Sequence, residues 1–172
     1  MTSKPITIAV LALGGQGGGA LADWLLEVAE HCGYLAQGTS VAGVAQRTGA
    51  TIYYLEFFPR SALRADGREP VMALMPSPGD VDVVVASELL EAGRAINRGL
   101  VTPNRTTLIA STHRDYTISE KSSLGDGRAD SGELKRAAAK AASRFVAFDM
   151  AAVAERSRGH ISAVILGAIS GS

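Results

Sequence analysis

Apolar positions along the chain follow two different periods, one typical of strands and one typical of helices. Residues 5–13 are almost continuously apolar, as in a parallel strand that is covered on both faces. Residues 18–32 then place apolar side chains at helical spacing, with acidic side chains on the other face. Further strands are expected at 34–39, 51–58, 71–74, 80–86, 106–111 and 145–148, and further helices at 87–96, 133–144, 150–156 and 161–170.

The order of these elements predicts the fold class. Strands alternate with helical stretches along most of the chain, which indicates an α/β fold with three α/β/α layers and a mostly parallel sheet. Residues 51–75 are expected to add antiparallel strands at one edge. A length of 172 residues suits a single domain over residues 1–172 that is long enough to bury a full core.

The last predicted helix, at 161–170, is apolar nearly all round. A helix of this kind is expected to be buried on every side. It runs almost to the end of the sequence, with no polar residues or cap behind it. We therefore expect either that the sequence is one domain of a longer polypeptide or that another chain covers this helix.

A cluster of glycines follows the first predicted strand and opens the first predicted helix. Glycine reaches backbone angles that are closed to other residues, and it lets a ligand or another backbone approach closely. The first amides of a helix lack partners within it and carry the positive end of its dipole, which suits a phosphate or a carboxylate. The candidate cofactor-binding residues are Gly14, Gly15, Gln16, Gly17 and Gly18.

This glycine turn also fits the dinucleotide fingerprint G-x-G-x-x-G/A, through Gly15, Gly17 and Ala20. The fingerprint expects an acid about 20 residues further on, to hold a ribose hydroxyl, and residues 34–40 contain none. Three interpretations stay open. The turn faces a ligand or a partner subunit, or its glycines only let the helix pack closely on its strand, or it holds the phosphate of a nucleotide.

A second loop, at 40–50, is rich in small and polar residues. It follows a strand, at the edge where open α/β sheets bind ligands. Arg47 offers a fixed bidentate donor to a carboxylate or phosphate, and Gln46 offers neutral hydrogen bonds. The candidate substrate-facing or partner-facing residues are Ser40, Gln46, Arg47 and Thr48; the alternative is a solvated loop.

Three other polar residues invite a chemical interpretation. Asp80 and Asp82 share one face of a strand, but no third ligand accompanies them, which favours a turn and strand cap over a metal site. His113 stands just after a strand end, where a general base could sit. Because no nucleophile with an orienting acid can be assigned around it, a structural or partner-facing role is favoured, and no catalytic residue is assigned.

Composition excludes several classes of function. Lysine and arginine (17) balance aspartate and glutamate (17), so no net field attracts nucleic acid or an anionic membrane. The single cysteine, Cys32, excludes an internal disulfide and a CxxC-type zinc or iron–sulfur site. The sequence lacks the features of a signal peptide and any apolar run of about 20 residues, so a cytoplasmic protein is expected.

The motifs together resemble a known family. Gly14-Gly15-Gln16-Gly17 after a strand, followed some 30 residues later by Ser40 and Ala45-Gln46-Arg47-Thr48-Gly49, resembles the gamma-type domain of the 2-oxoacid:ferredoxin oxidoreductases. The particular resemblance is to the beta subunits of indolepyruvate ferredoxin oxidoreductases. It covers the whole chain, with two departures. Family members usually read Arg-Gly-Gly where this chain has Arg47-Thr48-Gly49, and the longer beta subunits continue well past residue 172, as an N-terminal fragment would imply.

The resemblance implies a Rossmann-like fold and a role in oxidative decarboxylation of indolepyruvate or other aryl pyruvates, with coenzyme A and ferredoxin, to the acyl-CoA and carbon dioxide. It implies no cofactor on this chain alone, since thiamine diphosphate, magnesium and the iron–sulfur clusters belong to an alpha subunit or to other domains. Expected partners are that thiamine-bearing and cluster-bearing subunit, ferredoxin and a possible second copy of the chain. The isolated chain is expected to be inactive; the alternatives are a nucleotide-binding module or a purely structural subunit.

Overall fold

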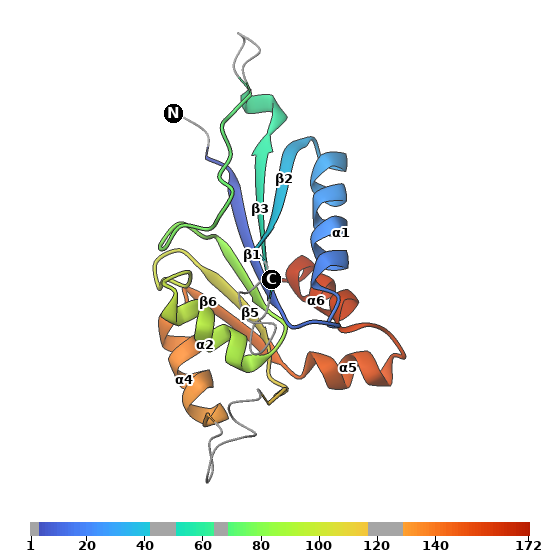
Figure 1. Cartoon of the computed structure of the whole chain (residues 1–172), viewed down its shortest axis with the longest axis vertical. Coiled ribbons are helices and arrows are strands. Elements are labelled where there is room, and N and C mark those ends of the chain that lie inside the picture. Colours follow the sequence, from blue (N-terminus) through green and yellow to red (C-terminus); the bar gives the residue numbers. More distant parts are fainter. Residues whose placement is uncertain (1–3, 42–50, 64–68, 117–128) are drawn as a thin grey trace.

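The computed structural model describes residues 4–41, 51–63, 69–116 and 129–172. Within them, one six-stranded sheet has the order β2-β3-β1-β4-β5-β6 (Figure 1). Its strands are β1 (Ile6–Ala12), β2 (Tyr34–Val41), β3 (Thr51–Pro59), β4 (Val83–Ala86), β5 (Thr107–Ser111) and β6 (Arg144–Phe148). The helices are α1 (Gly18–His31), α2 (Leu89–Asn97), α4 (Ser131–Ala141), α5 (Met150–Arg156) and α6 (Ile161–Ser170), with a short 3-10 turn, η1 (Arg60–Ala62).

The sheet has a parallel part and an antiparallel part. Strands β1, β4, β5 and β6 run parallel to one another, whereas β3 is antiparallel to both β1 and β2. The predicted α/β class with antiparallel strands at one end is confirmed. One detail differs from the prediction, because β3 lies inside the sheet, between β1 and the edge strand β2.

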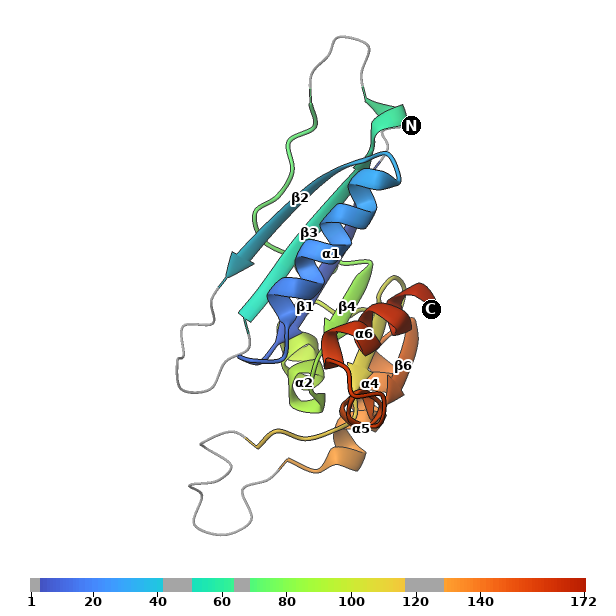
Figure 2. The same cartoon turned by 90° about the vertical axis from the view of Figure 1, so that its right-hand side faces the viewer.

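Helices cover both faces of the sheet, which gives the three predicted layers (Figures 1 and 2). Alternate side chains of β1 enter two separate cores: Ala9 and Leu11 pack with α2 and α4, and Ile8 and Val10 pack with α1 and α6. Because both faces of β1 are covered, both of its side-chain sets must be apolar. This explains the continuous apolar run that the sequence shows.

The strand predicted at 71–74 is wrong. This segment crosses a face of the sheet in extended form, and side chains rather than a strand hold its backbone. Gln37 Nε2 donates to the Ala73 carbonyl at 2.9 Å, and Thr39 Oγ1 donates to the Leu74 carbonyl at 2.7 Å. Glu56 Oε2 accepts from the Ala73 amide at 2.9 Å. These three bonds satisfy backbone groups that a strand would satisfy through a ladder.

Two predicted boundaries also move. The strand predicted at 80–86 begins only at Val83, since residues 80–82 form a turn and a polar network. The helix predicted at 133–144 is α4 (Ser131–Ala141). It begins earlier because Asp130 caps it, accepting from the Glu133 amide, and it ends earlier because Arg144 already belongs to β6.

Helix α6 is partly buried within this chain. Ser162 and Ile165 are its buried residues, and Ala163, Gly167 and Ser170 are exposed. Its half-buried apolar residues pack against the core beside α1. That another chain or the rest of a longer polypeptide covers the remaining surface of this helix stays a prediction. None of the described helices is both long and apolar enough to cross a bilayer.

Candidate functional site

The glycine turn lies between two adjacent strands whose following helices pack on opposite faces of the sheet. Strands β1 and β4 are adjacent and parallel, yet α1 after β1 packs on one face and α2 after β4 packs on the other. Open α/β sheets bind ligands in the crevice at such a switch point, at the carboxyl ends of the strands. The candidate residues Gly14 to Gly18 follow β1 at this crevice (Figure 2).

The turn needs glycine at two positions for backbone reasons. Gly15 has φ +84° and Gly17 has φ +72°, both in the left-handed region. The Gln16 amide donates to the Leu13 carbonyl at 3.1 Å, which closes the turn. Gly17 is also the N-cap of α1, and no side chain caps this helix. The first amides of α1 are therefore left to other partners.

The two halves of the turn differ in what surrounds them. A Cβ on Gly17 would lie 2.9 Å from Ser162 Oγ, and one on Gly18 would lie 2.5 Å from the Ala12 Cβ. Gly14 and Gly15 are exposed, and a Cβ on either would meet nothing within 4 Å. Close packing thus accounts for Gly17 and Gly18, while Gly14 and Gly15 present their backbone outward.

Gln16 ties this turn to the next strands. Its Oε1 accepts a hydrogen bond from Ser87 Oγ, directly after β4, and Ser87 Oγ in turn accepts from the Leu13 amide at 3.3 Å. Its Nε2 lies 3.4 Å from His113 Nε2, beyond the end of β5. The Gln16 side chain therefore spans the carboxyl ends of three strands and fixes the turn between them.

His113 completes the network with both ring nitrogens. An amide nitrogen only donates, so His113 Nε2 is assigned as the acceptor from Gln16 and Nδ1 as the donor to Ser111 Oγ, at 2.7 Å. Ser111 Oγ also accepts from the Met150 amide at 3.0 Å. We name Gln16, Ser87, Ser111 and His113 the carboxyl-edge network. These contacts fit the structural role that the sequence favoured for His113.

No pattern in the sequence points to Ser87 and Ser111 as parts of one site. Both are completely buried, and they lie 24 residues apart in the chain, Ser87 directly after β4 and Ser111 at the end of β5. Single serines after apolar strands are common. The parallel pairing of β4 with β5 brings them together, and that pairing has no local sequence signature.

A buried ion pair between Glu88 and Arg114 lies next in sequence to Ser87 and His113 of the carboxyl-edge network. Glu88 is 1% exposed, and its Oε1 accepts from Arg114 Nε at 2.8 Å. Its Oε2 accepts from the Leu90 amide at 2.8 Å and so caps α2. Burial raises the pKa of Glu88, although the Leu90 amide and Arg114 work against that shift. The guanidinium of Arg114 also stacks over the Tyr116 ring, 5.3 Å from its centroid.

The second predicted loop ends beside the turn. Gln46, Arg47 and Thr48 lie outside the described residues. The strands on either side are placed, however: Thr51 pairs with Ala12, and Val41 at the end of β2 pairs with Ile52. Val41 and Thr51, the described residues nearest to this loop in the sequence, therefore lie at the edge where the glycine turn lies.

Ser40 is brought near the turn through Tyr53. Ser40 pairs with Tyr53 across β2 and β3, and both line a hollow of about 170 Å³ between α1 and β2. The Tyr53 ring also packs on Gly18, where an added Cβ would lie 2.7 Å from Cε2. Of the predicted site residues that the structure describes, Ser40 and the glycine turn thus lie on either side of one aromatic ring.

The arrangement differs from a dinucleotide-binding unit in one respect. That unit places its second strand next to the first, with an acid at its end. Here β3 lies between β1 and β2, and β2 carries no acidic residue. The geometry therefore offers the anion-binding turn without the ribose-binding strand beside it.

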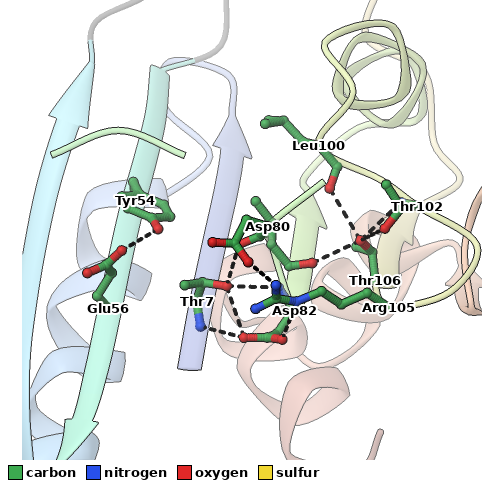
Figure 3. A network of polar contacts seen from close by, with 10 residues as sticks. Thr7, Tyr54, Glu56, Asp80, Asp82, Leu100, Thr102, Arg105 and Thr106 are labelled. Atoms are coloured by element: carbon green, nitrogen blue, oxygen red, sulfur yellow. Dashed lines mark hydrogen bonds and ion pairs between the residues drawn. The ribbon is translucent and has the colours of Figure 1, made fainter. Parts of the chain in front are cut away.

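Asp80 and Asp82 serve the opposite edge of the sheet (Figure 3). Asp82 Oδ2 accepts from both the amide and the hydroxyl of Thr7 at 2.9 Å, and its Oδ1 accepts from Arg105 Nε at 2.8 Å. Arg105 also pairs with Asp80. Burial alone would raise the pKa of Asp82, but the hydrogen bonds from Arg105 and Thr7 lower it overall. The predicted turn and strand cap is confirmed. We name Thr7, Asp80, Asp82 and Arg105 the amino-edge network.

The donor set of the described residues does not fit a metal or a cluster. Among them, no group of three or more His, Cys, Asp or Glu side chains could hold a metal ion. Iron–sulfur clusters are held by about four cysteines, and the whole sequence contains one.

Comparison with known proteins places this fold. The family model described as pyruvate ferredoxin/flavodoxin oxidoreductase matches residues 7–172. A pyruvate oxidoreductase subunit from Thermotoga maritima has 20% identity and a TM-score of 0.59, covering 96% of this chain and 75% of that chain. The gamma subunit of a keto/oxoacid ferredoxin oxidoreductase from Geobacter sulfurreducens PCA has 14% identity and a TM-score of 0.53, covering 93% and 70%.

A third solved structure is similar over a smaller share of its length. It is a 2-oxoglutarate:ferredoxin oxidoreductase from Magnetococcus marinus with 2-oxoglutarate, coenzyme A and succinyl-CoA bound. Identity is 13% and the TM-score 0.57, over 96% of this chain and 23% of that one. No curated protein matches the chain significantly. At these identities the solved structures establish the fold.

Proposed function

Since the chain belongs to the pyruvate ferredoxin/flavodoxin oxidoreductase family, we propose that it is the gamma-type subunit or domain of a complex that oxidatively decarboxylates a 2-oxoacid. The complex joins the acyl group to coenzyme A, releases carbon dioxide and passes two electrons singly to ferredoxin. The family match over nearly the whole chain is the observation that carries this proposal.

The proposed substrate class is the aryl pyruvates, with indolepyruvate as the leading candidate. The support is the resemblance of the glycine turn and the 45–49 segment to the indolepyruvate enzymes. The similar solved structures come from enzymes of pyruvate, 2-oxoglutarate and unspecified oxoacids. A substrate panel on the assembled enzyme therefore has to include aliphatic as well as aryl oxoacids.

The proposed role of this chain is to face the subunit that performs the carbon chemistry. The supporting geometry is the position of Gly14 and Gly15, whose exposed backbone lies at the crevice between β1 and β4. Val41 and Thr51, which flank the 42–50 segment, lie at the same edge. We propose that Arg47 from this segment holds a carboxylate or phosphate by two parallel bonds, with Gln46 beside it.

The cofactors of the reaction are assigned to the partner. In the partner, thiamine diphosphate with magnesium would supply the carbon nucleophile, and iron–sulfur clusters would take the electrons; the residues that the structure describes in this chain do not fit a metal, and the sequence has one cysteine. Coenzyme A is a co-substrate of the complex. The proposed role of this chain's residues is to bind and orient groups of the partner at the interface. The isolated chain is expected to be inactive. The complete complex is expected to be cytoplasmic and to bind ferredoxin.

The test is turnover of the reconstituted complex with indolepyruvate, phenylpyruvate, pyruvate and 2-oxoglutarate, with coenzyme A and an electron acceptor. Arg47→Ala is expected to lower turnover by about a hundredfold or more, the usual cost of a lost charged contact to a reacting group. The chain should stay folded. Arg60→Ala, an exposed arginine in η1, is the matched control. Near-normal turnover of Arg47→Ala contradicts the role given to this loop.

A nucleotide-binding module is the second candidate function. The left-handed glycine turn and the uncapped start of α1 favour it. Equilibrium dialysis of the isolated chain against NAD and ATP distinguishes the two. Binding of a nucleotide by the isolated chain, together with failure to assemble with any thiamine-bearing chain, would replace the first proposal.

A further inference from the structure

A shallow apolar hollow of about 400 Å³ is lined by the carboxyl-terminal half of α1 and by Leu166 of α6; Figure 2 shows the arrangement of the two helices. Large apolar side chains lie open there: Trp24 is 36% exposed and Val28 is 53% exposed. Contiguous apolar surface of this kind marks an interaction site more often than isolated exposed residues do. The lining residues are Trp24, Glu27, Val28, His31, Cys32 and Leu166.

The helix that supplies most of this hollow is acidic. Glu27 lines the hollow, and Asp23 and Glu30 are exposed on the same helix. Helix α1 contains no lysine or arginine, and α6 contains no charged residue at all. The chain as a whole is neutral, so the negative charge of α1 is a local feature of this helix.

The charge pattern separates the possible occupants. A second copy docking by a two-fold axis would bring the same surface against itself, so the acidic side of α1 would meet the acidic side of another α1. An anionic membrane would meet the same repulsion. A helix that carries an apolar ridge flanked by lysine or arginine would bury the Trp24 and Val28 side chains and pair with the acids.

We propose that the α1/α6 hollow docks a basic amphipathic helix from a partner chain. Two helices side by side form the groove that such a helix requires, with anchors one turn apart. The docked helix would also contact Leu166 of α6, which lines the hollow and is only half-buried in this chain.

The chain carries its own reporters at this site. Trp24 is the only tryptophan and Cys32 the only cysteine, and both line the hollow. The probe is a helical peptide of about 14 residues, matching α1 in length, with leucines on one face and lysines on the flanks. We expect a blue shift of Trp24 fluorescence, and alkylation of Cys32 by iodoacetamide slowed by about fivefold or more at saturation.

Matched variants locate the binding. Val28→Lys places a cation within the apolar hollow and should weaken peptide binding by about tenfold or more, whereas the same change at the fully exposed Val71 should not. Glu27→Lys should weaken binding by about threefold to tenfold, and Glu69→Lys, exposed elsewhere, should leave it unchanged. Circular dichroism checks that each variant is folded.

Several outcomes would overturn the proposal. An equal response to the peptide with glutamate in place of lysine would show that charge plays no part. An unchanged affinity in both Val28→Lys and Glu27→Lys would place binding elsewhere. Protection of Cys32 that rises with protein concentration alone would indicate a second copy, and protection by phosphatidylserine vesicles would indicate a membrane. None of these readouts needs turnover, so failure here leaves the proposed function standing.

Discussion

Two polar networks lie at opposite ends of the same strands, β1, β4 and β5. The amino-edge network consists of charged groups that satisfy one another, with Arg105 between two carboxylates and the side chains of Arg105 and Asp82 24% and 33% exposed. The carboxyl-edge network contains no carboxylate, lysine or arginine, and it holds a turn whose backbone faces outward. Asp80 and Asp82 thus connect the amino ends of neighbouring strands, whereas serine and glutamine side chains position the turn of the candidate site.

The two ends also differ in how deeply their charges are buried. The carboxyl edge rests on Glu88 and Arg114, whose side chains are 1% and 8% exposed. Burying two charges costs desolvation energy that their mutual contact offsets in large part, so removing one partner leaves the other charge buried without its counter-charge. The same removal at the amino edge leaves a group that water reaches.

The largest effect is therefore expected from Glu88→Ala. It removes the carboxylate that neutralises the buried Arg114 and the cap of α2, so the free energy of unfolding should fall by about 3–5 kcal/mol. Urea unfolding followed by circular dichroism measures it. Glu88→Gln, which keeps an oxygen for the Leu90 amide, should lose less. A loss below about 1 kcal/mol for Glu88→Ala would show that the buried pair adds nothing over an exposed one.

Asp82→Ala tests the other end. It removes the acceptor of the Thr7 amide, the Thr7 hydroxyl and Arg105 Nε. Hydrogen bonds to charged groups contribute about 1.5–3 kcal/mol, and the expected loss lies near the upper end of that range. Asp80→Ala is the control, because its side chain is 55% exposed and shares only Arg105. Its loss should stay below about 1 kcal/mol.

The sequence predicted the features that depend on neighbouring residues, and it did not predict the features that depend on residues far apart in the chain. The period of apolar residues is local, and it placed β1, α1 and α6 nearly at their observed bounds. The position of β3 between β1 and β2 depends on long-range pairing, which leaves no local pattern. The same limit applies to the site: the glycine turn has a local signature, whereas Ser87 joins it only because β4 lies beside β1.

A glycine pair separates packing from ligand approach within the turn. Gly18→Ala would set its Cβ against Ala12 and Tyr53, and overpacking of this kind costs about 1–3 kcal/mol. Gly19→Ala meets the Tyr53 ring at no less than 3.5 Å and should be neutral or stabilise the helix by up to about 1 kcal/mol. Thermal unfolding of both variants measures the difference. Equal melting temperatures would mean that α1 has more room against β1 than the structure indicates.

The two edges should respond to acid in opposite directions. The pKa of Asp82 is lowered from 3.8 in the folded state, so its contribution to stability is present above 3.8 and is lost as the pH falls through the folded pKa. The pKa of Glu88 is raised from 4.5, so its contribution is fully present below 4.5 and is lost as the pH rises through the folded pKa. The change in the free energy of unfolding that either titration causes should be smaller than the change caused by removing the side chain.

Urea unfolding from pH 3 to pH 7 of the wild type, Asp82→Asn and Glu88→Gln isolates these contributions. The stability difference between wild type and Asp82→Asn should shrink as the pH falls below about 4. The stability of the wild type relative to Glu88→Gln should increase as the pH falls. Parallel curves for all three proteins would remove the distinction drawn between the two edges.

A small effect on stability together with a loss of function is expected from Gln16→Ala. Ser87 and His113 each lose one neutral hydrogen bond, so unfolding should become easier by only about 1 kcal/mol. Turnover of the assembled complex should nevertheless fall by about tenfold, the effect of some 1.4 kcal/mol at the transition state. Gln37→Ala is the matched control. The Gln37 side-chain amide also donates a hydrogen bond, to the Ala73 carbonyl, but it lies away from the glycine turn. If both variants lose turnover equally, stability alone explains the loss, and the carboxyl-edge network has no part in positioning the glycine turn.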